Sequence, residues 1–502
     1  MEDSVARVGA SEPIALAAFA GYLLVVLAIG VYATRFSSRG VGEFFVGGRR
    51  MNRVVVALSA VVSGRSAWLL LGVTGVAYTQ GASAIWTVTG YTVVELVLFL
   101  TLARRIRRFA EEHDCVTLPD VFAARFDDRR GGLRLALAMV LLVFMVGYVS
   151  AQFTAGGKAI GASFGLSPGT GVLITAGIVL GYTMTGGFLA VSLTDTLQAV
   201  FMLVGLVILP VVAVMHGGGL GAVRSELAGF DPTLVDPMAL SLGAFLGAVG
   251  IGLGSPGNPQ ITIRFMSIED ESQLRFAAGV ATFWNVVMGV GAVSIGLVGR
   301  ALIPEVASLP GADPESLYPV LAQQHLPPVL FGVVVASIFA AIMSTADSQL
   351  LVAASTVARD VYEKVLKRDQ VVDPTRLVRI SRGVVVVLVG ASLALGVVAA
   401  DVVFWLVLFA WGGLGAAIGP PLILSLYWRR TTAAGVLAGM VTGTAVTVGW
   451  ALTPALKGAL YELIPAFCAS ALAVVLVSLA TSESEAPTPR SRTSEATAPV
   501  NS

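Results

Sequence analysis

Residues 340–350 read Ala-Ala-Ile-Met-Ser-Thr-Ala-Asp-Ser-Gln-Leu and lie inside a long apolar segment, Val329 to Val357, that predicts a membrane span. Polar and ionisable side chains at membrane depth are costly, and by default they mark an ion or substrate pathway. At helical spacing one face of this span carries Ala341, Ser344, Thr345 and Ser348, with Asp347 at its edge. A strip of hydroxyls beside one carboxylate supplies the oxygen ligands that a small hard cation takes. The segment therefore predicts a cation site inside the membrane.

The composition agrees with a membrane protein. The chain has 502 residues, 56% of them hydrophobic, a mean hydropathy of +0.84 and a net charge of +1. These values exclude an ordinary soluble domain and give no bulk basic character for nucleic acid. The two cysteines and three histidines show no metal-ligand spacing. Because the sequence has neither a nucleophile–base pair nor a cofactor loop, we expect no enzyme activity and no cofactor.

Thirteen apolar segments are long enough to span a bilayer, so we expect an all-α integral membrane protein. The first has an acidic leader and predicts a retained helix rather than a cleaved signal peptide. A transporter domain is expected over 1–480 and a disordered tail over 481–502, which is rich in Ser, Thr, Pro and Glu. The predicted spans are 13–34, 54–79, 83–103, 133–156, 171–189, 194–215, 239–262, 276–302, 328–357, 381–400, 403–426, 432–453 and 459–480.

Lysine and arginine predict the orientation. With the N-terminus outside, most of the 32 basic residues fall in inner segments, which include 104–108, Arg264 and 359–382. This bias follows the positive-inside rule. We therefore expect a multi-pass protein of the cell inner (plasma) membrane with its N-terminus outside, its C-terminus and tail in the cytoplasm, and a monomer as the functional unit.

Two spans are interrupted by residues that break helices. Span 2 is broken at 63–66, Ser-Gly-Arg-Ser, and span 7 at 252–259, Gly-Leu-Gly-Ser-Pro-Gly-Asn-Pro. The breaks are five spans apart, and an odd offset predicts two inverted five-helix repeats, spans 2–6 and 7–11. Paired breaks of this kind indicate a transporter binding site, because freed backbone groups are tolerated only where they face protein or a water-lined cavity.

Four further side chains inside spans have more than one interpretation. Arg65 is a structural partner of Asp347, Asp195 or Glu95, an anchor for a substrate carboxylate, or a tethered cation in place of a coupling ion. Asp195 is either a cap at the start of span 6 or a second carboxylate on an ion route. Trp68 and Tyr148 either line a substrate pocket or serve only packing.

The chain resembles the sodium:solute symporter family, and is closest in pattern to its bacterial sodium/proline symporters. The resemblance covers about residues 13–480. It is carried by Leu58-Ser-Ala-Val-Val-Ser-Gly-Arg-Ser-Ala-Trp-Leu-Leu-Leu-Gly72, Gly186-Gly-Phe-Leu-Ala-Val-Ser-Leu-Thr-Asp-Thr-Leu-Gln-Ala199, Gly257-Asn-Pro-Gln-Ile-Thr-Ile-Arg-Phe-Met266 and Ala340-Ala-Ile-Met-Ser-Thr-Ala-Asp-Ser-Gln-Leu-Leu351. It implies thirteen helices around two inverted repeats, in agreement with the count and the paired breaks.

The resemblance also implies a sodium site between spans 2 and 9. The implied ligands are the carbonyls of Val62, Arg65 and Ala341 and the hydroxyls of Ser344 and Thr345. A second cation or coupling site is implied at Asp195, Asp347 and Ser348. The solute is expected between the two breaks, near Arg65, Ser66, Trp68, Tyr148, Ser255 and Asn258.

Several positions depart from the pattern of the proline symporters. Gly64 stands where they carry Asp, Arg65 where they carry an apolar residue, and Ile251 and Ser255 where they carry aromatics. These differences argue against proline as the solute. We expect sodium-coupled symport of a small organic solute, an amino acid or another carboxylate, by alternating access. The alternatives are a cation-independent transporter, with Arg65 replacing the ion, and a solute sensor that does not transport.

Overall fold

The computed structural model describes residues 2–37, 47–184, 187–368, 370, 372–398 and 402–481. Within these residues the protein is helical, and the only β-type pairing is an isolated bridge between Met51 and Ile268. The tail predicted to be disordered lies outside the described residues, except Thr481, which ends the last helix.

The thirteen predicted spans are confirmed. Ten helical segments are long and apolar enough to cross a membrane, and one of them, Arg53–Leu100, contains both the second and the third predicted span. Two shorter apolar segments, Pro168–Thr183 and Leu242–Gly257, correspond to the fifth and the seventh. The unbroken spans are α1 (Glu2–Ser37), α5 (Ile85–Leu100), α8 (Gly132–Phe164), α9 (Pro168–Thr183), α10 (Phe188–His216), α14 (Leu274–Leu302), α16 (Pro328–Ser355), α17 (Pro374–Val398), α18 (Val403–Tyr427), α19 (Ala433–Ala451) and α21 (Leu463–Thr481).

The remaining helices connect the spans. α6 follows α5 directly, and η10 continues α16 as a π-helix. The connecting helices are η1 (Gly47–Arg49), η3 (Gly81–Ala84), α6 (Leu102–Glu112), α7 (Leu118–Phe126), α11 (Leu220–Phe230), η4 (Pro232–Val235), η6 (Glu271–Gln273), η7 (Val306–Ser308), η8 (Pro310–Ala312), η9 (Pro314–Ser316), α15 (Leu317–His325), η10 (Thr356–Leu366) and α20 (Pro454–Ala459).

Both predicted breaks are present. Span 2 consists of α3 (Arg53–Ala67), the π-helical η2 (Trp68–Val73) and α4 (Thr74–Gln80), and Ser66 leaves the helical conformation with φ 44° and ψ −172°. A positive φ is uncommon for a residue with a Cβ, and such strain is concentrated at functional sites. Span 7 consists of α12 (Leu242–Gly250), the 3₁₀ segment η5 (Ile251–Gly257) and α13 (Pro259–Ser267).

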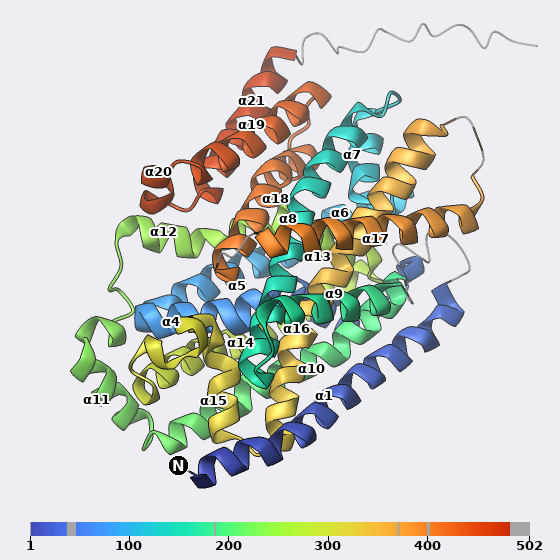
Figure 1. Ribbon diagram of the computed structural model, residues 1–502. Helices are drawn as coiled ribbons and strands as arrows, with labels where there is room; N and C mark the ends of the chain where they lie inside the picture. Colours follow the sequence, from blue (N-terminus) through green and yellow to red (C-terminus); the bar gives the residue numbers. More distant parts are fainter. Residues whose placement is uncertain are drawn as a thin grey trace, which may run out of the picture.

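The broken spans lie in the middle of the bundle. α16 packs against α3, α8 and α10, and α18 packs against η5. In the most apolar window of α16, 83% of the residues are buried, against 28% in α1 and in α21, which lie on opposite sides of the bundle (Figure 1). The polar strip of α16 is therefore enclosed by protein rather than by lipid.

One of the two interpretations of Asp195 is excluded, and the placement of Arg264 in a loop is wrong. α10 begins at Phe188, so Asp195 lies in its second turn and does not cap it. Arg264, counted among the residues of an inner loop, is buried in α13 with 1% of its surface exposed. Neither residue faces solvent, so each needs a polar partner inside the protein.

Candidate functional site

The polar strip of α16 faces the backbone of α3 just before its break. The Ser344 hydroxyl lies 3.3 Å from the Val62 carbonyl oxygen and 3.2 Å from that of Ala341. The Thr345 hydroxyl lies 3.5 Å from the Val62 carbonyl and 3.3 Å from that of Ser63. Each hydroxyl has a single proton but two acceptors, so all these hydrogen bonds are long and shared. The result is a cluster of five oxygen atoms with spare acceptor capacity.

The spacing of this oxygen cluster suits a small cation. Hard cations of this size bind oxygens at about 2.4 Å, so neighbouring ligands of an octahedral site lie about 3.4 Å apart. The separations between the hydroxyl and carbonyl oxygens of the cluster run from 3.2 to 3.5 Å. The structure thus brings together four of the five predicted ligands, Val62, Ala341, Ser344 and Thr345, and adds the Ser63 carbonyl. The Arg65 carbonyl accepts a hydrogen bond from the Trp68 amide, and its part in the site stays a prediction.

One turn further along α16, a buried ion pair joins three other helices. Asp195 of α10 and Arg264 of α13 are 2.8 Å apart, with 0% and 1% of their side chains exposed. Arg264 also donates to the hydroxyls of Ser59 and Ser348, at 2.6 Å each, and Ser59 donates to Asp195 at 2.6 Å. Ser63 donates to the same Asp195 oxygen at 3.3 Å. The guanidinium therefore supplies the counter-charge that a carboxylate at this depth requires.

Asp347 borders the Asp195–Arg264 pair without joining it directly. The Ser348 hydroxyl lies 3.3 Å from one Asp347 oxygen, and the other oxygen has no hydrogen-bond partner among the described residues. One oxygen of Asp195 is also without a partner there. Asp195, Asp347 and Ser348, predicted as a second cation site, thus lie together, and Arg264 is their neighbouring cation.

Arg65 turns away from α16. Its Nε donates to Asn285 of α14 at 2.8 Å, its Nη2 lies 3.4 Å from Glu95 of α5, and its guanidinium covers the Tyr91 ring at 3.3 Å. Glu95 is therefore the partner among the three that the sequence left open. Arg65 Nη1 and Glu95 Oε1 have no hydrogen-bond partner among the described residues. Within one ion pair, Arg65 thus keeps an unused N–H donor and Glu95 keeps an unused oxygen acceptor.

Aromatic rings enclose this charged pair. Tyr91 stacks on Trp68 and Trp411, at 6.4 and 5.3 Å between ring centroids, and Trp68 stacks on Phe404 at 5.8 Å. A cavity of about 160 Å³ lies beyond this stack, lined in part by Phe404 and Ile251. Phe404 therefore belongs both to the wall of this cavity and to the aromatic stack.

Gly64 is required by Tyr91. A Cβ at position 64 would lie 2.2 Å from the Tyr91 hydroxyl oxygen and 3.2 Å from Ile261 Cδ1. An aspartate at position 64, as the resemblance to bacterial proline symporters implies, has no room here unless Tyr91 moves. The changes at positions 64 and 65 are thus linked, because Tyr91 both fills the space beside Gly64 and stacks on Arg65.

The other predicted solute-site residues surround the two breaks. The Ser66 hydroxyl accepts from the Trp68 amide at 3.1 Å, and Tyr148 of α8 contacts Ser66. Ser255 lies beside Tyr91. Asn258 donates to the Gly254 and Trp411 carbonyls, at 2.8 and 3.4 Å, and so ties the broken segment η5 to α18. The amide of Asn258 therefore satisfies the Gly254 carbonyl inside the break and joins it to α18.

Several residues of these clusters are not predicted by any sequence pattern above. The count of basic residues places Arg264 in an inner loop, although it stands in the apolar run Ile261 to Met266, which is a signal of burial. Gln152 of α8 accepts from the Ala67 amide at 3.1 Å, directly after the break. The pairing of Asn285 with Arg65 and Glu95 joins positions far apart in the chain, and no local sequence pattern predicts it.

A second charged cluster lies beyond the end of α16. Asp120 of α7 pairs with Arg134 at 2.7 Å and with Arg359 at 3.2 Å, and Arg134 also pairs with Asp360. Burial raises the pKa of Asp120, but Arg359 and Arg134 outweigh it and hold this pKa below its ordinary value. The cluster ties α7 to the start of α8 and to η10.

Comparison with known proteins agrees with this arrangement. A sequence model of the sodium:solute symporter family matches residues 44–443. The osmoregulated proline transporter OpuE of Bacillus subtilis (strain 168) is 35% identical over 463 residues, 92% of this chain and 93% of the relative. A sodium/proline symporter of Staphylococcus aureus (strain USA300 / TCH1516) is 35% identical over 467 residues, 91% of each chain.

Solved structures support the same fold. A sodium-coupled sialic acid symporter in a substrate-bound outward-open state superposes with a TM-score of 0.79 at 19% identity, over 94% of this chain and 98% of its own. Mhp1, a nucleobase-cation-symport-1 family transporter, superposes with a TM-score of 0.58 at 13% identity, over 89% of this chain and 94% of its own. At these identities the similarity concerns the fold alone.

Proposed function

The chain belongs to the sodium:solute symporter family, and we propose that it carries a zwitterionic amino acid across the membrane together with sodium. It is a multi-pass protein of the plasma membrane and a transporter, not an enzyme. The orientation we propose has the N-terminus outside and the C-terminus inside, because that choice places most arginines in the cytoplasm.

The observation that carries sodium coupling is the oxygen cluster between α3 and α16. Ser344 and Thr345 present hydroxyls to the Val62 carbonyl at 3.3 and 3.5 Å. These neutral oxygens can bind a monovalent cation without a charged ligand. Because these ligands come from the broken span and from its neighbour, an ion there holds the two together. Sodium binding would therefore favour one state of an alternating-access cycle.

The orientation of Arg65 argues against a cation-independent transporter. A guanidinium that replaced the ion would have to face Ser344 and Thr345, but its polar contacts are with Glu95 and Asn285. Arg264 instead accompanies Asp195 at the predicted second cation site. We propose one sodium ion per cycle, with Arg264 as the permanent counter-charge of Asp195.

The unused groups of the Arg65–Glu95 pair support an amino acid as the solute. Arg65 Nη1 and Glu95 Oε1 have no hydrogen-bond partner in the described part of the chain, so Nη1 can donate to a carboxylate and Oε1 can accept from an ammonium group. The pair is neutral overall, so a neutral zwitterion adds no net charge to the buried site. The stack of Trp68, Tyr91 and Trp411 offers an apolar wall for a side chain.

A ligand-stabilisation screen of the purified full chain tests this proposal. The ligands are neutral amino acids, their amides, which lack the carboxylate, and their decarboxylated amines, each in sodium chloride and in N-methylglucamine chloride. We expect an amino acid to raise the melting temperature, the amide and the amine to do so far less, and sodium to enlarge the effect. Stabilisation by the amine alone would refute the role of Arg65. Uptake into proteoliposomes then separates transport from sensing, because a sensor binds the ligand without accumulating it.

A further inference from the structure

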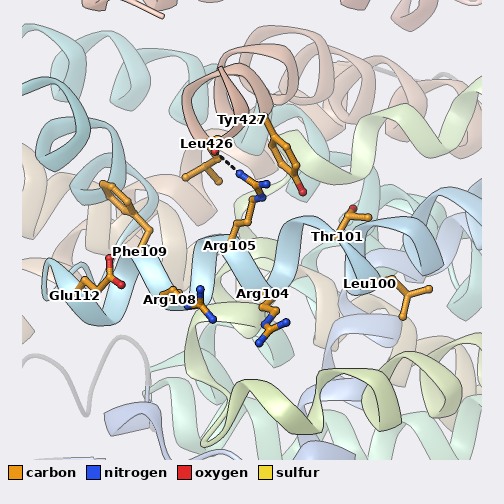
Figure 2. A pocket seen from close by; sticks show the side chains of 9 residues that line it. All are labelled: Leu100, Thr101, Arg104, Arg105, Arg108, Phe109, Glu112, Leu426 and Tyr427. Atoms are coloured by element: carbon orange, nitrogen blue, oxygen red, sulfur yellow. Dashed lines mark hydrogen bonds between the residues drawn. The ribbon is translucent and has the colours of Figure 1, made fainter. Parts of the chain in front are cut away.

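An open pocket of about 710 Å³ lies where α5 meets α6, beside the end of α18. Three arginines of α6, Arg104, Arg105 and Arg108, line it together with Leu100 and Tyr427. Figure 2 shows Arg105 reaching from α6 toward Tyr427, with Arg104 and Arg108 along an adjacent side of the same helix. The charged groups of this pocket are exposed, whereas those of the solute and ion clusters are buried.

The arginines of the pocket have more charge than their partners neutralise. Arg104 and Arg108 share one carboxylate oxygen of Glu271, at 3.1 and 2.8 Å, and are 62% and 55% exposed. Arg105 has no carboxylate within the described part of the chain; it donates to the Leu426 carbonyl at 3.1 Å and covers the Tyr427 ring at 3.9 Å. Glu112 also lines the pocket, so three guanidinium groups face two carboxylates. The pocket therefore keeps a net positive charge and unused N–H donors, which suit a phosphate group.

An apolar stripe leads from the pocket along α5. Val93, Val97 and Leu100 follow at i, i+4 and i+7 and are 54%, 50% and 51% exposed, as expected for side chains that face lipid. The opposite face of α6 is fixed to the protein, because buried Arg107 donates to the carbonyls of Ile268 and Glu269. α6 is thus an amphipathic helix at the end of a membrane span, where anionic headgroups and arginines meet.

We propose that this pocket binds the headgroup of an anionic phospholipid, with the phosphate on Arg104, Arg105 and Arg108 and an acyl chain along Val93 and Val97. The adjoining apolar stripe favours a lipid over a free phosphate, which would use the arginines alone. Assignment to the cytoplasmic leaflet rests on the orientation proposed above, whereas the binding itself does not. A lipid seated here contacts both α5, which carries Glu95, and α18, which carries Trp411, so its headgroup stabilises their contact.

Native mass spectrometry of the full chain in detergent tests the proposal. The ligands are phosphatidylglycerol, phosphatidylcholine with the same acyl chains, dioctanoyl phosphatidylglycerol and inorganic phosphate. We expect phosphatidylglycerol to be retained at least roughly tenfold more strongly than phosphatidylcholine. The short-chain lipid should bind more weakly, and inorganic phosphate should not compete at millimolar concentration. Equal retention of both lipids would overturn the proposal, and full competition by phosphate would identify a free-anion site instead.

Charge-matched variants separate the pocket from bulk electrostatics. Arg104→Gln/Arg105→Gln/Arg108→Gln should lose the preference for phosphatidylglycerol. Arg129→Gln/Arg130→Gln/Arg368→Gln, which removes three arginines elsewhere, should keep it. If the first variant does not fold, Glu112→Gln provides the test, because removing an opposing carboxylate should strengthen binding severalfold. Equal loss in both triple variants, or no gain in Glu112→Gln, would contradict the assignment.

Discussion

Replacing Glu95 by glutamine tests the buried pair that defines the proposed solute site. Arg65 Nη2 and Glu95 Oε2 are 3.4 Å apart, and each side chain is 1% exposed. At that distance and an effective dielectric constant near 20, the attraction is about 5 kcal/mol. Glu95→Gln leaves Arg65 charged and buried without a carboxylate, and its described partners are then Asn285, the Tyr91 ring and a neutral amide oxygen. Removing one partner of such a pair typically costs about 3–5 kcal/mol of unfolding free energy.

The assay compares unfolding of four purified proteins in the same detergent. These are the wild type, Glu95→Gln, Arg65→Met/Glu95→Gln, and Glu226→Gln as a control on the exposed surface of α11. Melting temperatures and unfolding rates are both measured, because unfolding of membrane proteins in detergent is commonly irreversible. We expect Glu95→Gln to be the least stable, the double variant to recover most of the loss, and the control to match the wild type.

The double variant also separates stability from binding. It should be folded and yet no longer be stabilised by a zwitterionic amino acid, because neither its carboxylate nor its ammonium group finds a partner. The reasoning is refuted if Glu95→Gln is as stable as Glu226→Gln, or if the double variant is less stable than Glu95→Gln. Either result would mean that the two charges do not compensate each other.

Two further predictions concern packing and pH. Gly64→Ala places a Cβ 2.2 Å from the Tyr91 hydroxyl and should cost about 1–3 kcal/mol of unfolding free energy. Gly64→Ala/Tyr91→Phe should recover most of this loss in the same melting assay. No recovery would mean that the clash is with another group. Arg359 and Arg134 hold the pKa of Asp120 below its ordinary value, so the folded state gains stability from the ionised carboxylate above about pH 4 and loses it as the pH falls further. Asp120→Asn should therefore accelerate unfolding at pH 7 and approach the wild type at pH 3, and an equal effect at both pH values would contradict this.

Much of the fold followed from local sequence patterns. Apolar length predicts a span, and the runs at 63–66 and 252–259 contain residues that break helices, so thirteen spans and two breaks were predictable. The boundaries were less so: α10 begins at Phe188 rather than near 194, because Phe188 to Leu193 is apolar enough for either a loop anchor or a helix. The ends of such helices depend on how the spans pack against one another, and a short window of sequence carries no information about that packing.

The clusters were predictable only in part. Hydroxyl spacing on one helix indicates a shared face, so Ser344 and Thr345 could be assigned together. The partner of Arg65 could not, because Glu95 and Asn285 come from spans whose relative rotation depends on the whole bundle. Arg264 was missed because the positive-inside rule counts arginines near span ends as loop residues, although this one is neutralised by Asp195 inside the protein.

Equilibrium binding of radioactive sodium to the purified full chain tests the central claim, that the oxygens between α3 and α16 bind the coupling ion. The comparison is between the wild type, Ser344→Ala/Thr345→Ala, and Ser355→Ala, which removes a hydroxyl of the same helix that donates to its own Val352 carbonyl at 2.7 Å. We predict saturable binding of one ion by the wild type and by Ser355→Ala, and binding at least roughly tenfold weaker in the double variant, equivalent to about 1.4 kcal/mol. Equal binding by all three proteins would contradict the assigned site.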